Sequence, residues 1–198
     1  MRLLSTVVFV LAVALSGAAS AQPRDAISAV VTLVEQKQCD EAYLRVAEVP
    51  LPEKPNAESE KAGRMLARAV SNCRAKDPVI AFALSEKALA FAPADPAVQT
   101  AHAESLLALQ QRGDAAALLD RILKFHPEEA RRARMLRGKL AAQESDHELA
   151  IRVLKPLEDD EQYGDEAAKL IQDSNQALER EHAGKADLAW AEADAREK

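Results

Sequence analysis

Few side chains in this sequence could do catalytic chemistry, and their spacing does not suit it. The 198 residues include four His and two Cys. The histidines have no second metal ligand at helical spacing and form no His-Glu-x-x-His pattern; they are His102, His126, His147 and His182. The glycine-rich patterns that cradle phosphates and the Gly-x-Ser-x-Gly pattern of a serine nucleophile do not occur either. The sequence therefore predicts no catalytic residue, no metal site and no cofactor.

The two cysteines, Cys39 and Cys73, lie far apart in the sequence. A redox pair would read Cys-x-x-Cys, and a zinc site would need further ligands close by. In an oxidising compartment two thiols are expected to pair. Closing a loop of about 34 residues would stabilise the fold by roughly 3 to 4 kcal/mol. We predict a structural disulfide; the alternative is two independent buried thiols.

Residues 1–21 have the pattern of a secretory leader. Arg2 gives a positive start, an apolar run follows over residues 3–15, and Ala19 to Ala21 form a small-residue cleavage site. We predict cleavage between Ala21 and Gln22, and an exported protein that is periplasmic or secreted and has no stable membrane anchor. A retained membrane anchor is the alternative, although the apolar run is short for spanning a bilayer.

The elements that position these residues are expected to be helices. Aromatic residues make up 4% of the chain and only 6 Gly are present, which is unlike a β-sandwich or barrel. After the leader, apolar residues recur at intervals of three and four, and nothing alternates with period two. The net charge of −6 argues against a nucleic-acid partner, because phosphate neutralisation needs a basic surface.

A repeat of about 34 residues runs through the middle of the chain. A shift by one repeat aligns these sets: Ala83, Ala117 and Ile151; Leu89, Leu123 and Leu157; Phe91 and Phe125; Pro93 and Pro127. A period of this length indicates stacked supersecondary units, because no single unit can bury its apolar face alone.

This repeat resembles the tetratricopeptide repeat, whose unit is a helical hairpin with Ala early in its second helix and Pro just after that helix. Ala81 with Pro93, and Ala115 with Pro127, reproduce the pairing at the same separation in two units. The resemblance covers about residues 62–160. It implies an all-α protein, a right-handed α–α superhelix of about four hairpins plus a C-terminal capping helix.

The expected boundaries follow from capping residues and turns. Asp77 and Asp95 are good N-caps, and the Pro residue after each is tolerated in the first helical turn. We expect hairpins over 25–49, 60–92, 96–126 and 129–158. The resulting regions are a signal peptide (1–21), a leading hairpin with a proline-rich linker (22–57), the repeats (58–163) and a capping segment (164–198) that Gly184 could interrupt.

The hairpin arrangement also bears on the cysteines. If the hairpins stack as the resemblance implies, Cys39 stands at the start of a second helix, beside the end of the first helix that carries Cys73. Their disulfide would bridge the proline-rich linker and tie the leading hairpin to the stack.

Basic residues gather on the expected first helices of the hairpins. In the tetratricopeptide family these helices line a groove that binds an extended peptide or a partner helix. Guanidinium groups bind carboxylates through two parallel hydrogen bonds. The resemblance thus implies a groove for an acidic segment or a C-terminal carboxylate, formed by Arg64, Arg68, Gln99, His102, Arg131, Arg134 and Arg137. The alternative is that the arginines only support their own helices, since Glu60 stands four residues before Arg64.

We therefore expect a non-enzymatic protein- or peptide-interaction module, a scaffold or adaptor of the cell envelope. The alternative is an envelope hydrolase or small-ligand-binding protein, whose site would lie between the stack and the last helical segment and include His182. An open groove would favour the first hypothesis and a deep closed pocket the second. Self-association through the hairpins is a third hypothesis.

Overall fold

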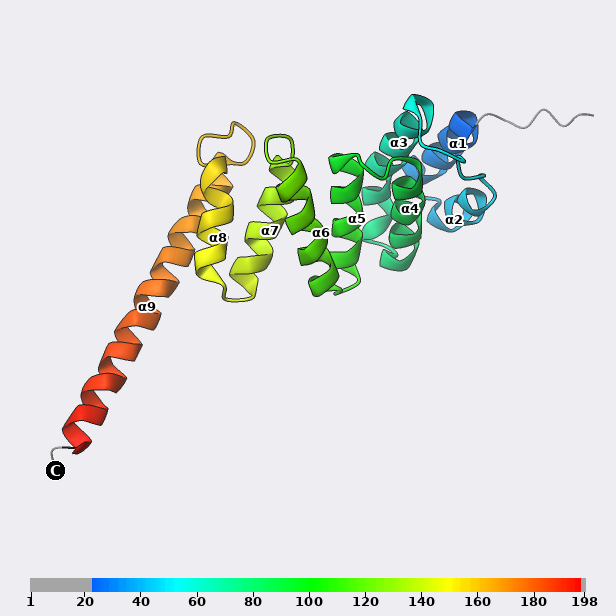
Figure 1. Ribbon diagram of the computed structural model, residues 1–198. Helices are drawn as coiled ribbons and strands as arrows, with labels where there is room; N and C mark the ends of the chain where they lie inside the picture. Colours follow the sequence, from blue (N-terminus) through cyan, green and yellow to red (C-terminus); the bar gives the residue numbers. More distant parts are fainter. Residues whose placement is uncertain (1–22, 197–198) are drawn as a thin grey trace, which may run out of the picture.

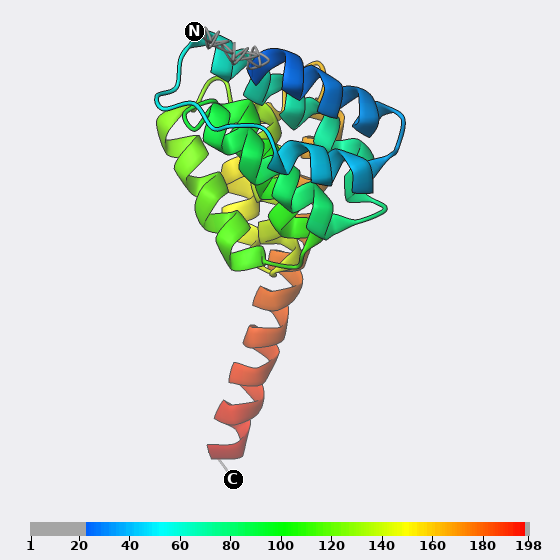
Figure 2. The same cartoon turned by 90° about the vertical axis from the view of Figure 1, so that its right-hand side faces the viewer.

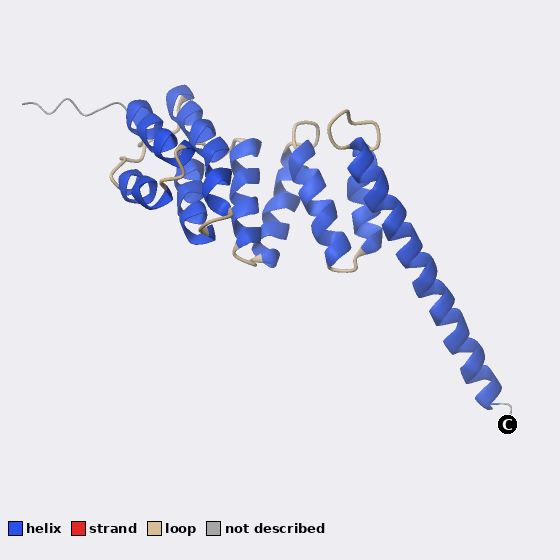
Figure 3. Cartoon of the chain, turned by 180° about the vertical axis from the view of Figure 1, so that it is seen from behind, coloured by secondary structure: helices blue, strands red, loops and turns tan. Residues whose placement is uncertain are grey.

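The computed structural model describes residues 23–196, and the predicted leader with its cleavage site lies outside them. The described chain consists of helices and loops (Figures 1 and 3). The helices are α1 (Pro23–Glu35), α2 (Cys39–Ala47), α3 (Ala57–Arg74), α4 (Pro78–Phe91), α5 (Pro96–Ala108), α6 (Arg112–Phe125), α7 (Arg131–Gln143), α8 (His147–Leu154) and α9 (Gly164–Arg196). A 3-10 turn, Lys155–Leu157, follows α8. None of these helices is long and apolar enough to cross a lipid bilayer.

The helices form four hairpins that stack in chain order, followed by α9. The first helices of successive hairpins lie side by side, since α1 contacts α3, α3 contacts α5, α5 contacts α7, and α7 contacts α9. Figure 2, seen from the end that carries α1 and α2, shows these two helices lying across the end of the stack. The prediction of an all-α solenoid with four hairpins and a final helix is confirmed.

Local sequence sets the helix starts. The Asp77 carboxylate accepts hydrogen bonds from the backbone N–H groups of Val79 and Ile80, and Asp95 caps α5 in the same way. Asn56 caps α3 in a reciprocal capping box with Ser59. These caps satisfy N–H groups that have no partner within their helix, so they fix where α3, α4 and α5 begin.

The core is distributed along the stack instead of around one centre. One cluster of buried side chains, which includes Phe91 and Leu66, lies among α1 to α5. A second cluster around Leu119 joins α5, α6 and α7, and a third around Leu154 joins α7, α8 and α9. Each hairpin therefore buries its apolar face only against its neighbours, as expected for a solenoid.

Close helix packing inside a hairpin depends on a small residue. A Cβ placed at Gly63 of α3 would lie 2.8 Å from the Cβ of Ala92 and 2.9 Å from the carbonyl oxygen of Ala88. Helices α3 and α4 can approach this closely because Gly63 has no side chain.

The predicted disulfide is present. Cys39 is the first residue of α2 and Cys73 lies near the end of α3; their Cα atoms are 5.7 Å apart and both side chains are buried. The bond spans the linker over residues 48–56 and fastens the leading hairpin to the next one.

Helix α9 packs on the stack only through its first part. Ala167, Ile171 and Ser174 are buried against the last hairpin, whereas the rest of α9 projects away from the stack (Figure 1). The helix runs through Gly184, so the expected interruption there is wrong. A single Gly costs a helix only about 1 kcal/mol relative to Ala, which its neighbours in a long helix can offset.

Candidate functional site

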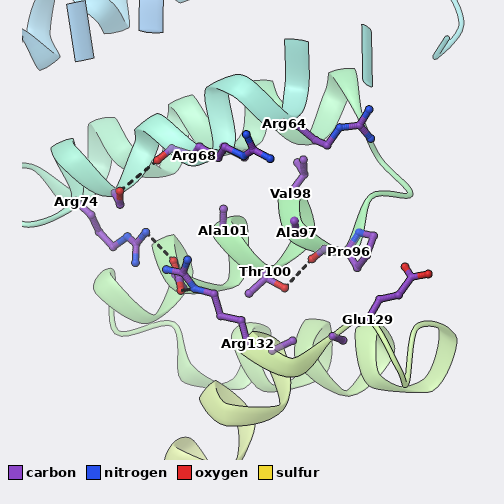
Figure 4. A pocket seen from close by; sticks show the side chains of 15 residues that line it. Arg64, Arg68, Arg74, Pro96, Ala97, Val98, Thr100, Ala101, Glu129 and Arg132 are labelled. Atoms are coloured by element: carbon purple, nitrogen blue, oxygen red, sulfur yellow. Dashed lines mark hydrogen bonds and ion pairs between the residues drawn. The ribbon is translucent and has the colours of Figure 1, made fainter. Parts of the chain in front are cut away.

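A pocket of about 300 Å³ lies where the first helices of three hairpins meet (Figure 4). Alanine side chains from all three helices line it: Ala67 of α3, Ala97 and Ala101 of α5, and Ala133 of α7. Four arginines surround these alanines: Arg64, Arg68, Arg74 and Arg132. We call this pocket, with its lining from α3, α5 and α7, the groove.

Helical spacing brings the α3 arginines to one face. Arg64 and Arg68 are one turn apart, and Ser71 and Arg74 continue the same row at steps of three. Residues three and four apart lie above one another on a helix, so all four side chains reach the groove.

Arg64 is already engaged within the protein. Its Nη1 donates a hydrogen bond to Oδ2 of Asp95 over 2.9 Å and lies 4.0 Å from Oε2 of Glu60. Because Asp95 also caps α5 through its other oxygen, Arg64 links α3 to the start of α5. Its main role in the described structure is to join neighbouring hairpins.

Arg68 is different because it is exposed and has no ion-pair partner among the described residues. Among the side chains that the structure describes, no carboxylate forms an ion pair with Arg68. Its charge is therefore available to an anionic group that enters the groove.

A buried carboxylate, Glu104 of α5, lies deeper in the groove. Its Oε2 forms an ion pair with Nη2 of Arg74 at 2.7 Å, and its Oε1 accepts a hydrogen bond from Nε of Arg132 over 2.6 Å. The Glu104 side chain is 6% exposed. Since Arg74 belongs to α3 and Arg132 to α7, one carboxylate holds three first helices together.

The three α7 arginines that the sequence predicted for the groove lie away from it. Nη1 of Arg131 donates to Asp160 over 3.0 Å, and Nη2 of Arg134 donates to the carbonyl oxygen of Pro127 over 2.9 Å. Arg137 is buried and makes two hydrogen bonds to Asp120 of α6, at 2.8 and 3.3 Å. Their own partners hold these three side chains, and none of them lines the groove.

Arg131 stabilises the charged form of Asp160 in the turn between the last hairpin and α9. The pKa of the Asp160 carboxyl is held below its usual 3.8, first by the hydrogen bond from the backbone N–H of Gln162 and also by Arg131 and the N–H of Tyr163. Arg131 thus helps to keep a turn carboxylate charged before α9.

Helix α5 lies between the two basic helices as expected, but Gln99 and His102 point to other surfaces. Nε2 of Gln99 donates to the carbonyl oxygen of Pro93 over 2.6 Å. Nδ1 of His102 lies 2.9 Å from the Ser85 hydroxyl oxygen, and its ring packs against Phe82. Around α5, Gln99 stands roughly half a turn and His102 roughly a third of a turn from the alanines of the groove.

His102 has a perturbed acidity because of this position. Burial lowers the pKa of His102 below its usual 6.5, and the charge of Glu86 opposes the shift. The neutral imidazole is therefore the form that suits the folded protein.

The groove uses three residues that the sequence prediction did not include: Arg74, Glu104 and Arg132. One sequence feature could have indicated Glu104, since it is the only charged residue in α5. A lone carboxylate on an otherwise neutral, buried helix needs a cationic partner from a neighbour.

The site expected under the hydrolase alternative lacks its central residue. His182 is exposed, and it lies beyond Ser174, the last buried residue of α9 among those that the structure describes. Within the part of the chain that the structure describes, no group of three or more His, Cys, Asp or Glu side chains is placed to hold a metal ion.

Comparisons with known proteins agree with the fold. No family model matches the chain, and no curated protein matches it by sequence. Among solved structures, MamA from AMB-1 in a P212121 crystal is 16% identical with a TM-score of 0.55, and covers 81% of this chain and 85% of its own. A C2221 crystal of the same protein is 16% identical with a TM-score of 0.54, and covers 84% of this chain and 95% of its own. The likeness shows that this chain shares the tetratricopeptide-like, all-α solenoid fold of MamA.

Proposed function

We propose that this protein is a non-enzymatic interaction module that holds a carboxylate-bearing peptide segment in the groove between α3, α5 and α7. The observation that carries the proposal is Arg68, an exposed cation without an ion-pair partner among the described side chains, beside a lining of alanines. A charge-assisted hydrogen bond from a guanidinium to a carboxylate contributes about 1.5 to 3 kcal/mol.

The lining of the groove suits a peptide. Small side chains at Ala97, Ala101 and Ala133 allow a peptide backbone to approach the helices closely, and a pocket of about 300 Å³ accommodates one or two side chains. The Arg68 guanidinium would bind a C-terminal carboxylate or an acidic side chain of the partner.

The hydroxyl groups in the groove support binding more than catalysis. Ser71 and Thr100 line it, and Oγ1 of Thr100 donates its hydrogen bond to the carbonyl oxygen of Pro96 over 2.6 Å. A backbone carbonyl does not activate a nucleophile, since activation needs a basic side chain within hydrogen-bond reach.

A role in the cell envelope is the second part of the proposal. The leader pattern over residues 1–21 and the Cys39–Cys73 disulfide both suit an exported protein that works in an oxidising compartment. The partner would then be an envelope protein with an accessible acidic segment or C-terminus.

Fluorescence anisotropy with a labelled probe tests the proposal. The probe is a ten-residue peptide of Ala and Ser with a free C-terminal carboxylate, and its control is the same peptide with a C-terminal amide. We expect the oxidised protein to bind the carboxylate form at least tenfold more tightly than the amide, and the affinity to fall as salt is raised.

Two charge reversals locate the site. Arg68→Glu should weaken binding by roughly 10- to 100-fold, which corresponds to the loss of about 1.5 to 3 kcal/mol. Arg121→Glu is the matched control, because Arg121 is exposed on α6 and lines hollows away from the groove. Equal loss of binding in the two variants, or equal binding of the acid and the amide, would refute the proposal.

A further inference from the structure

We infer that Glu104 limits the ligand to a single carboxylate. The Glu104 carboxylate occupies the deeper part of the basic groove, between Arg74 and Arg132, and leaves only Arg68 to bind a ligand carboxylate. This inference rests on the proposed function and names the ligand class of that site. It assigns Glu104 a role in specificity, in addition to its contacts between helices.

The geometry around Glu104 is that of a bound carboxylate. One oxygen forms an ion pair with Nη2 of Arg74 at 2.7 Å, and the other accepts a hydrogen bond from Nε of Arg132 over 2.6 Å. Each neighbouring first helix thus contributes one arginine, and both arginines are labelled in Figure 4. The Nε atom of Arg74 is buried beside this cluster and has no hydrogen-bond partner among the described residues. The place held by Glu104 thus offers donors from two guanidinium groups, as an anion site requires.

The charges of the groove show what is left for a ligand. Arg64 is paired with Asp95, and Arg74 and Arg132 share Glu104. Arg68 has no carboxylate partner among the described side chains. Glu129 also lines the groove, with its carboxylate exposed and 3.9 Å from Nδ1 of His126. One ligand carboxylate at Arg68 therefore completes the pairing of the four arginines.

A second anionic group would be disfavoured in the wild-type protein. Moving inward from Arg68, it would meet arginines that are already neutralised, and the buried Glu104 charge would repel it in a region of reduced dielectric. If Glu104 loses its charge, the same two arginines can accept that second group.

The test compares two ten-residue peptides of Ala and Ser with free C-termini. One ends in Ala and carries one carboxylate, and the other ends in Asp and carries two. Wild-type protein should bind both with dissociation constants within about threefold, whereas Glu104→Gln should bind the Asp-terminated peptide at least tenfold more tightly than the Ala-terminated one. Gln has almost the shape of Glu, removes the charge and replaces one acceptor oxygen with an NH2 donor, so the ratio of the two affinities within each protein reports the charge preference.

The outcomes separate this inference from the proposed function. If wild type binds both peptides and Glu104→Gln keeps the wild-type ratio, the inference is overturned and the proposed function stands. If wild type binds neither peptide but Glu104→Gln binds the Asp-terminated one, the proposed function fails and the masking role of Glu104 stands. If no form binds either peptide, both fail.

A chemical rescue covers the case in which loss of the charge destabilises the protein. In Glu104→Ala, acetate should fill the vacated site between Arg74 and Arg132 and raise the melting temperature by several degrees more than equal chloride does. In wild type, whose site is occupied by Glu104, the excess effect of acetate over chloride should be smaller than in the variant. The same excess in both proteins would overturn the inference.

Discussion

Removal of the disulfide is expected to destabilise one end of this protein and leave the other end unchanged. The double substitution Cys39→Ala with Cys73→Ala opens a loop that spans a sequence separation of 34. The chain-entropy relation gives about 4 kcal/mol for a loop of this length. Both side chains are buried, and Ala fits the space of a thiol with little other change.

The location of the loss follows from the solenoid. The main contacts of α1 and α2 outside their own hairpin are with α3 and α4, so the disulfide supports the first junction of the stack. In a stack of this kind, stability is a sum of terms for each unit and each neighbouring interface. The leading hairpin should therefore open locally, with the remaining hairpins intact.

Hydrogen exchange followed by mass spectrometry measures this directly. In the double variant, amides of α1 and α2 should exchange faster by up to several hundredfold, which corresponds to about 4 kcal/mol, while amides of α5 to α8 keep their wild-type rates. Leu119→Ala serves as a control, because it removes core packing among α5, α6 and α7 and should accelerate exchange there and not in α1 and α2. Equal acceleration throughout the double variant would refute the reasoning, since it would indicate one cooperative core.

Three further substitutions test packing, backbone conformation and acidity. Gly63→Ala should lower the free energy of unfolding in urea by about 1 to 3 kcal/mol, because the new Cβ would lie 2.8 Å from the Cβ of Ala92. A variant as stable as wild type would contradict the close packing of α3 against α4. Gln110→Gly should raise the unfolding free energy by about 1 kcal/mol, because Gln110 has a φ of 61°, in the left-handed region that favours Gly. Calorimetry that shows no gain in stability would contradict this backbone strain. Burial lowers the pKa of His102, so the unfolded chain binds more protons below about pH 6.5, and wild-type stability should rise between pH 5 and 7. In His102→Gln, denaturation curves across this range should show a smaller rise, and an unchanged rise would assign the effect to other groups.

Much of the fold could be predicted from local features of the sequence. Asp77 and Asp95, each followed by Pro, mark helix starts without any tertiary information, and the structure has helices beginning at Pro78 and Pro96. The disulfide could be predicted because only two cysteines exist and the hairpin arrangement brings them together.

The groove residues were harder to predict because a charged side chain can point to any side of its helix. Arg64 and Arg68 line the groove, whereas Arg137 turns to Asp120 on the second helix of the preceding hairpin. Which face of α7 meets the groove depends on how one hairpin is rotated against the next. That rotation results from packing along the whole stack, and the spacing of arginines on one helix does not encode it.

Residues at equivalent positions of successive repeats also differ in burial, which the 34-residue period does not reveal. Phe91 and Phe125 occupy the same position in successive units, yet Phe91 is fully buried and Phe125 is 65% exposed. Val98 is buried in the same core cluster as Phe91, and the residue one repeat after Val98 is Arg132, whose side chain pairs with Glu104. A residue that serves the groove has thus replaced an apolar one in the core pattern.

The most direct test of the central claim, that Arg68 is the groove's ligand-binding cation, is to observe the arginine side chains during binding. In nitrogen-15 NMR spectra of the oxidised protein, titration with the Ala- and Ser-containing carboxylate peptide should shift the Nε–H signal of Arg68 in a saturable way. The corresponding signals of Arg131 and Arg137, which are engaged with Asp160 and Asp120, should stay in place. Saturable shifts at Arg131 or Arg137 with none at Arg68 would contradict the claim.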